Sequence, residues 1–199
     1  MDRFVFNKRP ARVTQYLIIT FILMFFAEFL LPYGFVFYFG LVPKLVMKGY
    51  LWQLVTFVFL HGGLWHLLMN LLYLWQLGTD VEKGIGVVNY IKLIMFCVVG
   101  AGVLMSVIGL LSNPLIPIIG SSVINYGIIA AFIYLFPRVY LFHEKIRLKY
   151  ILIMLVILSM GKPLIFGHLG AMLIGYLFIK LNTNVNRKHK DTQINVANL

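Results

Sequence analysis

The chain has 199 residues, of which 61% are hydrophobic and only 12% are charged. A soluble domain of this length is nearer half apolar and a quarter charged, so the composition excludes an ordinary soluble protein. The net charge of +11 is also typical of nucleic-acid-binding proteins. Here, however, the basic residues flank long uncharged runs, so we interpret them as charges that orient helices across a bilayer, with no nucleic-acid partner. The single cysteine, Cys97, excludes a disulfide framework.

The apolar runs are arranged as six segments along the chain. A helix that spans a bilayer needs about 20 apolar residues, and fewer where its neighbours shelter it. On this pattern the sequence predicts helices at residues 16–33, 61–77, 87–111, 121–136, 148–160 and 164–181. Several of these are too short for a full span and are stable in a membrane only inside a packed bundle. The predicted fold class is therefore an all-α membrane protein, a six-transmembrane-helix bundle.

The segments divide the chain into three regions. We expect residues 1–15 to form a basic N-terminus, residues 16–181 the membrane domain, and residues 182–199 a polar, basic tail. Within the membrane domain, residues 34–60 are too broken by Pro43 to span and too apolar for a free loop. We therefore expect an embedded outer loop between the first two spanning helices, with its aromatic side chains at the membrane interface.

The distribution of Lys and Arg predicts the orientation in the membrane. If the N-terminus is inside, 14 of the 17 basic residues lie on the inner side. Only Lys44, Lys48 and Lys162 then lie on the outer side. Positive charge is enriched in cytoplasmic loops, so both termini are predicted to be cytoplasmic.

Several polar residues lie within the apolar segments, where burial requires a partner or a function. They are His61, His66, Asn70, Ser121, Ser122, Asn125 and His168. The second, fourth and sixth segments, which carry them, all run from outside to inside in the predicted topology. His66, Ser122 and His168 each lie near the start of a segment. We therefore expect these three side chains to meet in the outer half of the membrane.

These residue types can perform acyl transfer. A serine hydroxyl becomes a nucleophile when a histidine accepts its proton, which predicts Ser122 and His168 as the catalytic pair. His66 and Asn70, at i and i+4 on one helix face, can donate to an oxyanion, as can the free N–H groups at the start of the Ser122 helix. Five of the six carboxylates lie on the inner side, leaving only Glu28. The residues therefore predict a Ser–His dyad with no acid partner.

Small residues accompany this pair along both of its helices. Such residues let membrane helices approach closely, which would bring the short serine side chain within reach of the histidine. They are Gly120, Gly127, Gly167, Gly170, Ala171 and Gly175.

Three motifs together resemble the rhomboid family of intramembrane serine proteases. Residues 120–127, Gly-Ser-Ser-Val-Ile-Asn-Tyr-Gly, resemble the family's Gly-x-Ser-Gly nucleophile motif. Residues 168–175 resemble its catalytic-histidine helix, and residues 61–70 its second helix with the oxyanion His and Asn. The resemblance extends over about residues 49–180, and it is specific because the three motifs occur in the family's order on consistent helices.

Further positions match the family or depart from it. Tyr126 corresponds to a tyrosine that packs on the catalytic histidine, Trp52 to the tryptophan of a Trp-Arg pair in the outer loop, and residues 78–86 to a cytoplasmic turn. Two positions differ from the family: Val123 replaces the glycine after the nucleophile, and Gln53 replaces the loop arginine. Because Val123 is β-branched, we predict that it crowds the backbone N–H beside Ser122.

The resemblance implies an intramembrane serine endopeptidase that cuts transmembrane segments of other membrane proteins near the outer surface. It implies Ser122 and His168 as catalytic residues, His66 and Asn70 as oxyanion donors, and supporting roles for Tyr126, Gly120 and Gly170. It also implies no cofactor, no metal, and a small residue before the cut. Together with the charge distribution, it predicts a multi-pass protein of a bacterial plasma membrane whose partners are the lipid bilayer and its transmembrane substrates.

Other interpretations remain open from the sequence. A rhomboid-like pseudoprotease would bind membrane clients without cleaving them, although both dyad residues are present. A small transporter would require paired repeats or midplane charges, and neither occurs. Zinc binding by His61, His66 and His168 would require further acidic or cysteine ligands. His61 alone has a structural role as readily as a functional one, and Glu28 is expected to snorkel or to make a local hydrogen bond.

Overall fold

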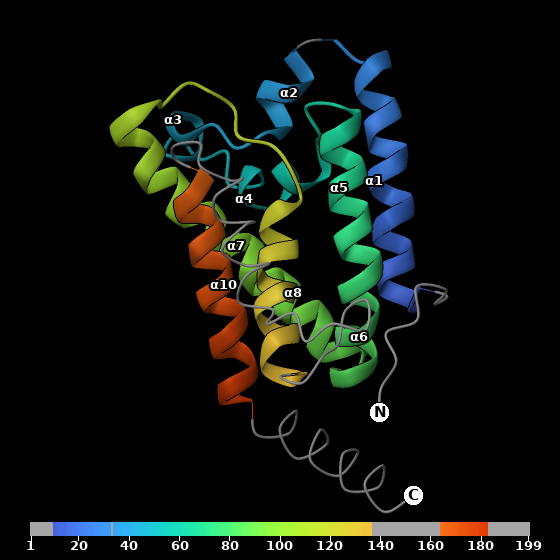
Figure 1. The fold of residues 1–199 in the computed structure, drawn as a ribbon. Helices are drawn as coiled ribbons and strands as arrows, with labels where there is room; N and C mark the ends of the chain where they lie inside the picture. Colours follow the sequence, from blue (N-terminus) through green and yellow to red (C-terminus); the bar gives the residue numbers. More distant parts are fainter. Residues whose placement is uncertain (1–9, 33, 137–163, 183–199) are drawn as a thin grey trace, which may run out of the picture.

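The computed structural model describes residues 10–32, 34–136 and 164–182. Within these ranges the regular elements are helices, apart from one isolated β-bridge. They are α1 (Arg12–Leu30), α2 (Gly34–Phe39), α3 (Pro43–Val46), α4 (Gln53–Thr56), the 3₁₀ turn η1 (Phe57–Phe59), α5 (Leu64–Tyr73), the π-helical stretch η2 (Leu74–Gly78), α6 (Thr79–Ile85), α7 (Val87–Ser112), α8 (Ser122–Leu135) and α10 (Leu164–Leu181). Figure 1 shows the helices as a bundle in which α1 begins and α10 ends at the same, lower end.

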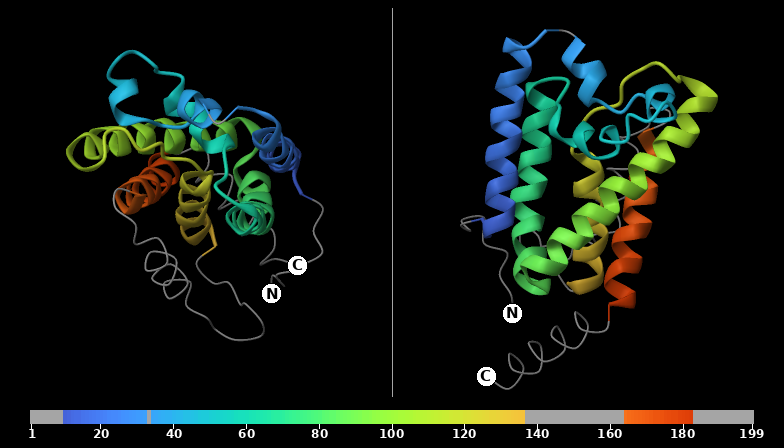
Figure 2. Two further views of the ribbon diagram at one scale, coloured as in Figure 1. Left: turned by 90° about the horizontal axis from the view of Figure 1, so that it is seen from above. Right: turned by 180° about the vertical axis from the view of Figure 1, so that it is seen from behind.

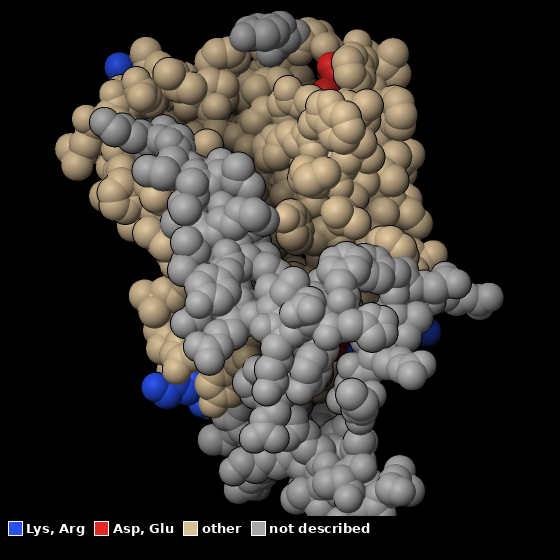
Figure 3. All heavy atoms as spheres, in the orientation of Figure 1, with Lys and Arg blue, Asp and Glu red and all other residues tan. Residues whose placement is uncertain are grey.

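Three of the described helices, α1, α7 and α10, are long and apolar enough to cross a membrane individually. The pair Gln53–Phe59 and Leu64–Ile85 passes the same test together but is bent by 99°. In the view of Figure 3, the visible charged atoms of the described residues lie toward the two ends of the bundle, and the tan surface between them shows none. The predicted segment 148–160 lies outside the described residues, so the count of six helices stays a prediction.

The short helix α8 lies between α5 and α10, with α7 on a third side (Figures 1 and 2). It has only 14 residues, and 11 of them are buried. A helix of this length is too short to span a bilayer by itself. Its neighbours shelter it on three sides, and the start of α8 lies below the upper ends of α1 and α5 (Figure 1).

At the lower end, Glu82 joins the second helical segment to α1. Its carboxylate accepts hydrogen bonds from the N–H groups of Val13 (2.9 Å) and Thr14 (2.8 Å) and from the Thr14 hydroxyl (2.8 Å). These bonds satisfy first-turn donors of α1 that have no partner within the helix. They explain why α1 begins at Arg12, four residues before the predicted start at residue 16.

The segment predicted as a cytoplasmic turn, residues 78–86, is mostly helical, and this part of the prediction is wrong. The helix that starts at Leu64 continues through η2 and α6 to Ile85 and ends at Gly86, whose φ of +84° favours glycine. The continuation places Glu82 inside a helix that faces α1. The true turn is the single position before α7.

Residues 34–60 form short helices at the upper end, beside α7 (Figure 2). Gln53 is fully buried and holds the segment together: its Oε1 accepts from the Val42 N–H (3.0 Å), and its Nε2 donates to the Phe37 carbonyl (2.8 Å). Backbone bonds of 2.9 and 2.8 Å between Leu41 and Ile118 then tie the segment to the loop before α8. Burial of this segment in the membrane stays a prediction.

Candidate active site

The central feature of the site is a hydrogen bond between two helices. Ser122 Oγ lies 2.8 Å from His168 Nε2, although the residues are 46 positions apart. Ser122 begins α8 and is half-buried, whereas His168 lies in the second turn of α10 and is buried. A serine hydroxyl at this distance can pass its proton to a neutral imidazole.

Glycines on the facing sides of α8 and α10 allow this short bond. A Cβ on Gly175 would strike the backbone of Gly127, and a Cβ on Gly127 would strike the side chain of Cys97. On the other side of α10, a Cβ on Gly170 would approach the Leu104 side chain of α7 to 2.6 Å. The close contact of α8 with α10 therefore depends on residues without side chains, as the sequence predicted.

The histidine ring is held by an aromatic neighbour. Tyr126 stacks on His168 with a centroid distance of 4.2 Å and an interplanar angle of 20°. Tyr126 follows Ser122 by one turn of α8, so both residues reach the same imidazole. No hydrogen-bond partner of His168 Nδ1 occurs among the described residues. Stacking, not a carboxylate, therefore orients the ring in the described part of the chain.

His66 lies against the loop that leads into α8. Gly120 has a φ of +124°, and a Cβ at this position would lie 2.6 Å from His66 Cε1 and 2.8 Å from its Nε2. A glycine at position 120 thus permits both the backbone turn and the approach of the imidazole. His66 itself is exposed, and its ring nitrogen is close to the start of the Ser122 helix.

Asn70 completes the group of predicted donors, one helical turn after His66. Its Nδ2 donates to the His66 carbonyl at 3.0 Å, and its Oδ1 accepts from Asn125 Nδ2 at 2.8 Å. Asn125 also donates to the Asn70 carbonyl at 3.1 Å. The sequence marked Asn125 as a polar residue at membrane depth without assigning it a task; the structure pairs it with Asn70.

A second Ser–His pair lies next to the first. Ser121 Oγ is 3.1 Å from His61 Nε2, and both residues are buried, at 1% and 2% exposed. Glu28 accepts a hydrogen bond from the His61 N–H at 2.9 Å, so it bonds to a residue 33 positions away and not locally. Because Ser121 is buried and Ser122 is half-buried, Ser122 is the more accessible of the two adjacent hydroxyl groups.

The start of α8 also leaves backbone donors free. No side-chain cap is present at Ser121, and the Ile124 N–H is the first along the helix to bond within it, to the Ser121 carbonyl at 2.9 Å. The N–H groups of Ser122 and Val123 therefore have no acceptor within the helix. The Val123 side chain is 1% exposed and belongs to the hydrophobic core.

The outer-loop positions that match the family have defined bonds. Trp52 Nε1 donates to the Tyr38 carbonyl at 2.9 Å, and Gln53 Nε2 donates to the same carbonyl at 3.2 Å. The glutamine at the position of the family's arginine therefore still bonds to loop carbonyls next to the tryptophan.

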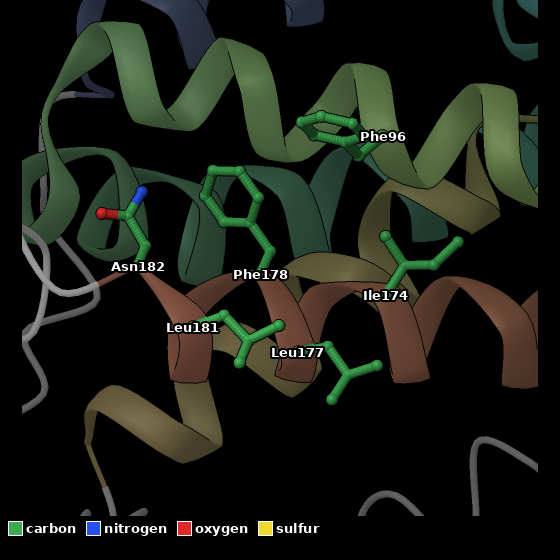
Figure 4. Close-up of a pocket in the computed structure, with 6 residues that line it drawn as sticks. All are labelled: Phe96, Ile174, Leu177, Phe178, Leu181 and Asn182. Atoms are coloured by element: carbon green, nitrogen blue, oxygen red, sulfur yellow. The ribbon is translucent and has the colours of Figure 1, made fainter.

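Two other features lie away from this chemistry. A groove of about 550 Å³ runs between α7 and α10 (Figure 4) and is lined by Phe96, Ile174, Leu177, Phe178, Leu181 and Asn182. It is apolar except for Asn182 and contains none of the predicted site residues. No group of three or more His, Cys, Asp or Glu side chains in the described ranges is placed to hold a metal ion.

Comparison with known proteins identifies the family of the chain. The family model of the Rhomboid domain matches residues 48–183, more than half of the chain. The chain belongs to the rhomboid family. With its long apolar helices, this membership makes it an integral membrane protein.

Three relatives, two from bacteria and one from a plant, show the extent of the similarity. The chain is 29% identical over 67% of its length to Rhomboid protease GluP of Bacillus subtilis, covering 26% of that protein. It is 29% identical over 69% of its length to RHOMBOID-like protein 4 of Arabidopsis thaliana, covering 36%, and 45% identical over 28% of its length to Rhomboid protease GlpG of Salmonella choleraesuis, covering 19%. The chain thus matches little more than a third, at most, of these relatives. Because a plant protein is among them, they do not assign the chain to a bacterial membrane.

Proposed function

We propose that this rhomboid is an intramembrane serine endopeptidase with Ser122 as nucleophile and His168 as general base. The observation that carries the proposal is the 2.8 Å contact between Ser122 Oγ and His168 Nε2 at the recessed start of α8. The protease names of the GluP and GlpG relatives support the same activity. Membership in the family alone does not establish it.

The proposed reaction has two halves. His168 accepts the Ser122 proton as Oγ attacks a substrate carbonyl, and the imidazolium then donates this proton to the leaving amine, which gives an acyl-enzyme. Water, deprotonated by His168, attacks the ester carbonyl and releases the new carboxyl end and the Ser122 hydroxyl. In each half the carbonyl oxygen becomes negatively charged. We assign the stabilising hydrogen bonds to His66, which packs against Gly120, to Asn70, which bonds to Asn125, and to the free N–H groups at the start of α8.

The substrates are proposed to be transmembrane segments of other membrane proteins. A helical segment has its carbonyls in hydrogen bonds, so local unwinding has to expose one of them to Ser122. Family resemblance implies a small residue before the cut. With 14 of the 17 basic residues predicted on the side of the termini, the site would lie in the outer half of the membrane, with both termini cytoplasmic.

Labelling with a fluorophosphonate probe tests the nucleophile. The purified wild-type protein should label and should cleave a model transmembrane substrate, whereas Ser122→Ala and His168→Ala should do neither while remaining folded. The double variant should be no worse than either single variant, because the pair acts as a unit. Cleavage by Ser122→Ala at the wild-type rate would refute the proposal. A folded wild type that neither labels nor cleaves would favour a pseudoprotease that only binds clients.

A thiol-labelling experiment tests the orientation. Ser112→Cys lies at the upper end of α7, and Asn195→Cys lies in the tail. In intact cells an impermeant thiol reagent should modify position 112 and leave position 195 unmodified. The native Cys97 is buried and provides little background. The opposite labelling pattern would place the site in the cytoplasmic half.

A further inference from the structure

One face of α8 carries three polar residues that all lie at the site. Ser122, Asn125 and Tyr126 are spaced i, i+3 and i+4, so they project from the same side of the helix. Ser122 bonds to His168 and Tyr126 stacks on it. Asn125 points to the other half of the site, where it meets Asn70 of α5.

The contact between the two asparagines has a direction. Asn125 Nδ2 donates to Asn70 Oδ1 at 2.8 Å and to the Asn70 carbonyl at 3.1 Å, and the side chains are 4% and 5% exposed. A carboxamide has an acceptor end and a donor end. With Asn70 Oδ1 bound to Asn125, the NH₂ group of Asn70 has to lie on the other side. One of its hydrogens bonds to the His66 carbonyl at 3.0 Å, which leaves the second to donate elsewhere.

We propose that Asn125 is a positioning residue that keeps the donor end of the Asn70 carboxamide turned toward the oxyanion. This inference rests on the proposed protease function, because it assigns a task within that site. If the Asn70 amide turned over, its NH₂ would face the NH₂ of Asn125, and Oδ1 would face the developing negative charge. Asn125 therefore disfavours the orientation that would repel the oxyanion.

The composition of the contact supports a task beyond packing. Asn125 Oδ1 is buried and has no hydrogen-bond partner among the described residues. An apolar side chain of similar size at this position would avoid a buried unpaired acceptor. The amide at position 125 is thus explained by what its NH₂ group donates to, and both acceptors belong to Asn70.

The decisive variant is Asn125→Asp, which keeps the shape and changes the hydrogen-bonding capacity. An ionised carboxylate only accepts, so it would draw the NH₂ of Asn70 toward itself and turn Oδ1 toward the reacting carbonyl. A protonated carboxyl can donate again and restore the native orientation. We expect kcat of Asn125→Asp to be lower than that of the wild type by about 100-fold or more at alkaline pH, where the buried carboxyl is ionised, with KM nearly unchanged. The deficit, measured against the wild type at each pH, should shrink as the pH is lowered.

Asn125→Leu and Asn125→Ala serve as matched controls that neither accept nor donate. They remove one of the two contacts that orient the Asn70 amide and leave its bond to the His66 carbonyl, so we expect kcat to fall by about tenfold, with a ratio to the wild type that is independent of pH. Asn125→Ala keeps the experiment decisive if the larger leucine prevents folding, and the thermal unfolding midpoint of each variant monitors the fold.

The same substitutions in an Asn70→Ala background separate positioning from helix packing. Without the Asn70 amide, Asn125→Asp should lower kcat by no more than about twofold further, and the pH dependence of the deficit should disappear. A deficit of equal size in both backgrounds, or one that does not change with pH, would overturn the proposal. So would wild-type kcat in folded Asn125→Asp at every pH up to the alkaline limit of the assay. An inactive wild type would instead overturn the proposed protease function itself, and this inference with it.

Discussion

Substitution of Gly175 by alanine tests how closely α8 and α10 must approach. A Cβ at this position would lie 2.9 Å from Gly127 Cα and closer still to the Gly127 carbonyl oxygen. Restoring the Cα distance to the 3.4 Å of ordinary van der Waals contact requires about 0.5 Å of separation, and clearing the closer carbonyl oxygen requires about 1 Å. Backbone atoms cannot rotate away as a side chain can, so the two helices have to move apart.

The separation of the two helices should lower kcat strongly and the free energy of unfolding only slightly. Overpacking costs about 1–3 kcal/mol, and part of this is offset because alanine in a helix is favoured over glycine by about 0.5–1 kcal/mol. The dyad bond of 2.8 Å joins the same two helices. A misplacement of about 1 Å can cost 100-fold in rate, so we expect kcat to fall by roughly tenfold to 100-fold.

Gly170→Ala is the matched control, on the same helix. Its Cβ would meet Leu104 Cδ2, the end of a flexible side chain, at 2.6 Å. The leucine can change rotamer, so α10 can stay in place and kcat should change by no more than about twofold. The assay is cleavage of one transmembrane substrate in detergent, with unfolding midpoints measured in parallel. Full activity in Gly175→Ala, or a larger loss in Gly170→Ala, would refute the argument from helix separation.

Three other substitutions test contacts outside the dyad. Ser121→Ala should remain active, because the Ser121 hydroxyl is buried against His61; loss of fluorophosphonate labelling in this variant would transfer the nucleophile from Ser122. Glu82→Gln should lower the free energy of unfolding by about 2–3 kcal/mol. Glu82 Oε2 accepts hydrogen bonds from the N–H and the hydroxyl of Thr14, and an amide NH₂ in its place cannot accept them. An unchanged midpoint of urea unfolding would contradict this. Gln53→Leu should lower thermal stability by about 2 kcal/mol through buried loop groups left unpaired, and an unchanged melting temperature would show that the loop does not depend on it.

Much of the helical pattern was predictable from the sequence, because long apolar runs have few alternatives in a membrane. The segments predicted at 87–111 and 164–181 agree with α7 and α10 to within one residue at each end. Their small residues and polar positions also predicted that Ser122 and His168 would meet. The prediction succeeded because it used the position of each residue along its segment and the direction in which each segment crosses the membrane. Both follow from the order and length of the apolar segments.

The contacts that fix helix ends were not predictable in this way. Glu82 caps α1 from a distance of 68 positions along the chain, and nothing near Thr14 in the sequence signals its partner. The same is true of Asn125, whose partner Asn70 lies 55 positions away. A local pattern identifies a buried polar residue as unusual, but only the packing of helices decides which group it meets.

Val123 occupies the position where the rhomboid motif has a glycine. The sequence predicted that a β-branched side chain would crowd the N–H beside Ser122. The structure places this side chain in the core, while the Val123 N–H remains without an acceptor within the helix. Replacement by glycine would therefore remove a buried side chain worth about 1.5–3 kcal/mol as well as any crowding. If crowding weakens the oxyanion contact, Val123→Gly should raise kcat and leave KM nearly unchanged on one transmembrane substrate.

The arrangement of α8 suggests why a short buried helix carries the nucleophile. Its face of Ser122, Asn125 and Tyr126 contacts His168 on one side and Asn70 on the other. On a helix in water these polar side chains would be solvated, and no protein partner would fix their orientation. In a sheltered bundle each polar group has to find a protein partner or remain unpaired at a cost, so the same burial that permits a short helix also fixes the orientation of its side chains. Preorganisation of the site is therefore a consequence of the position of α8 between its neighbours.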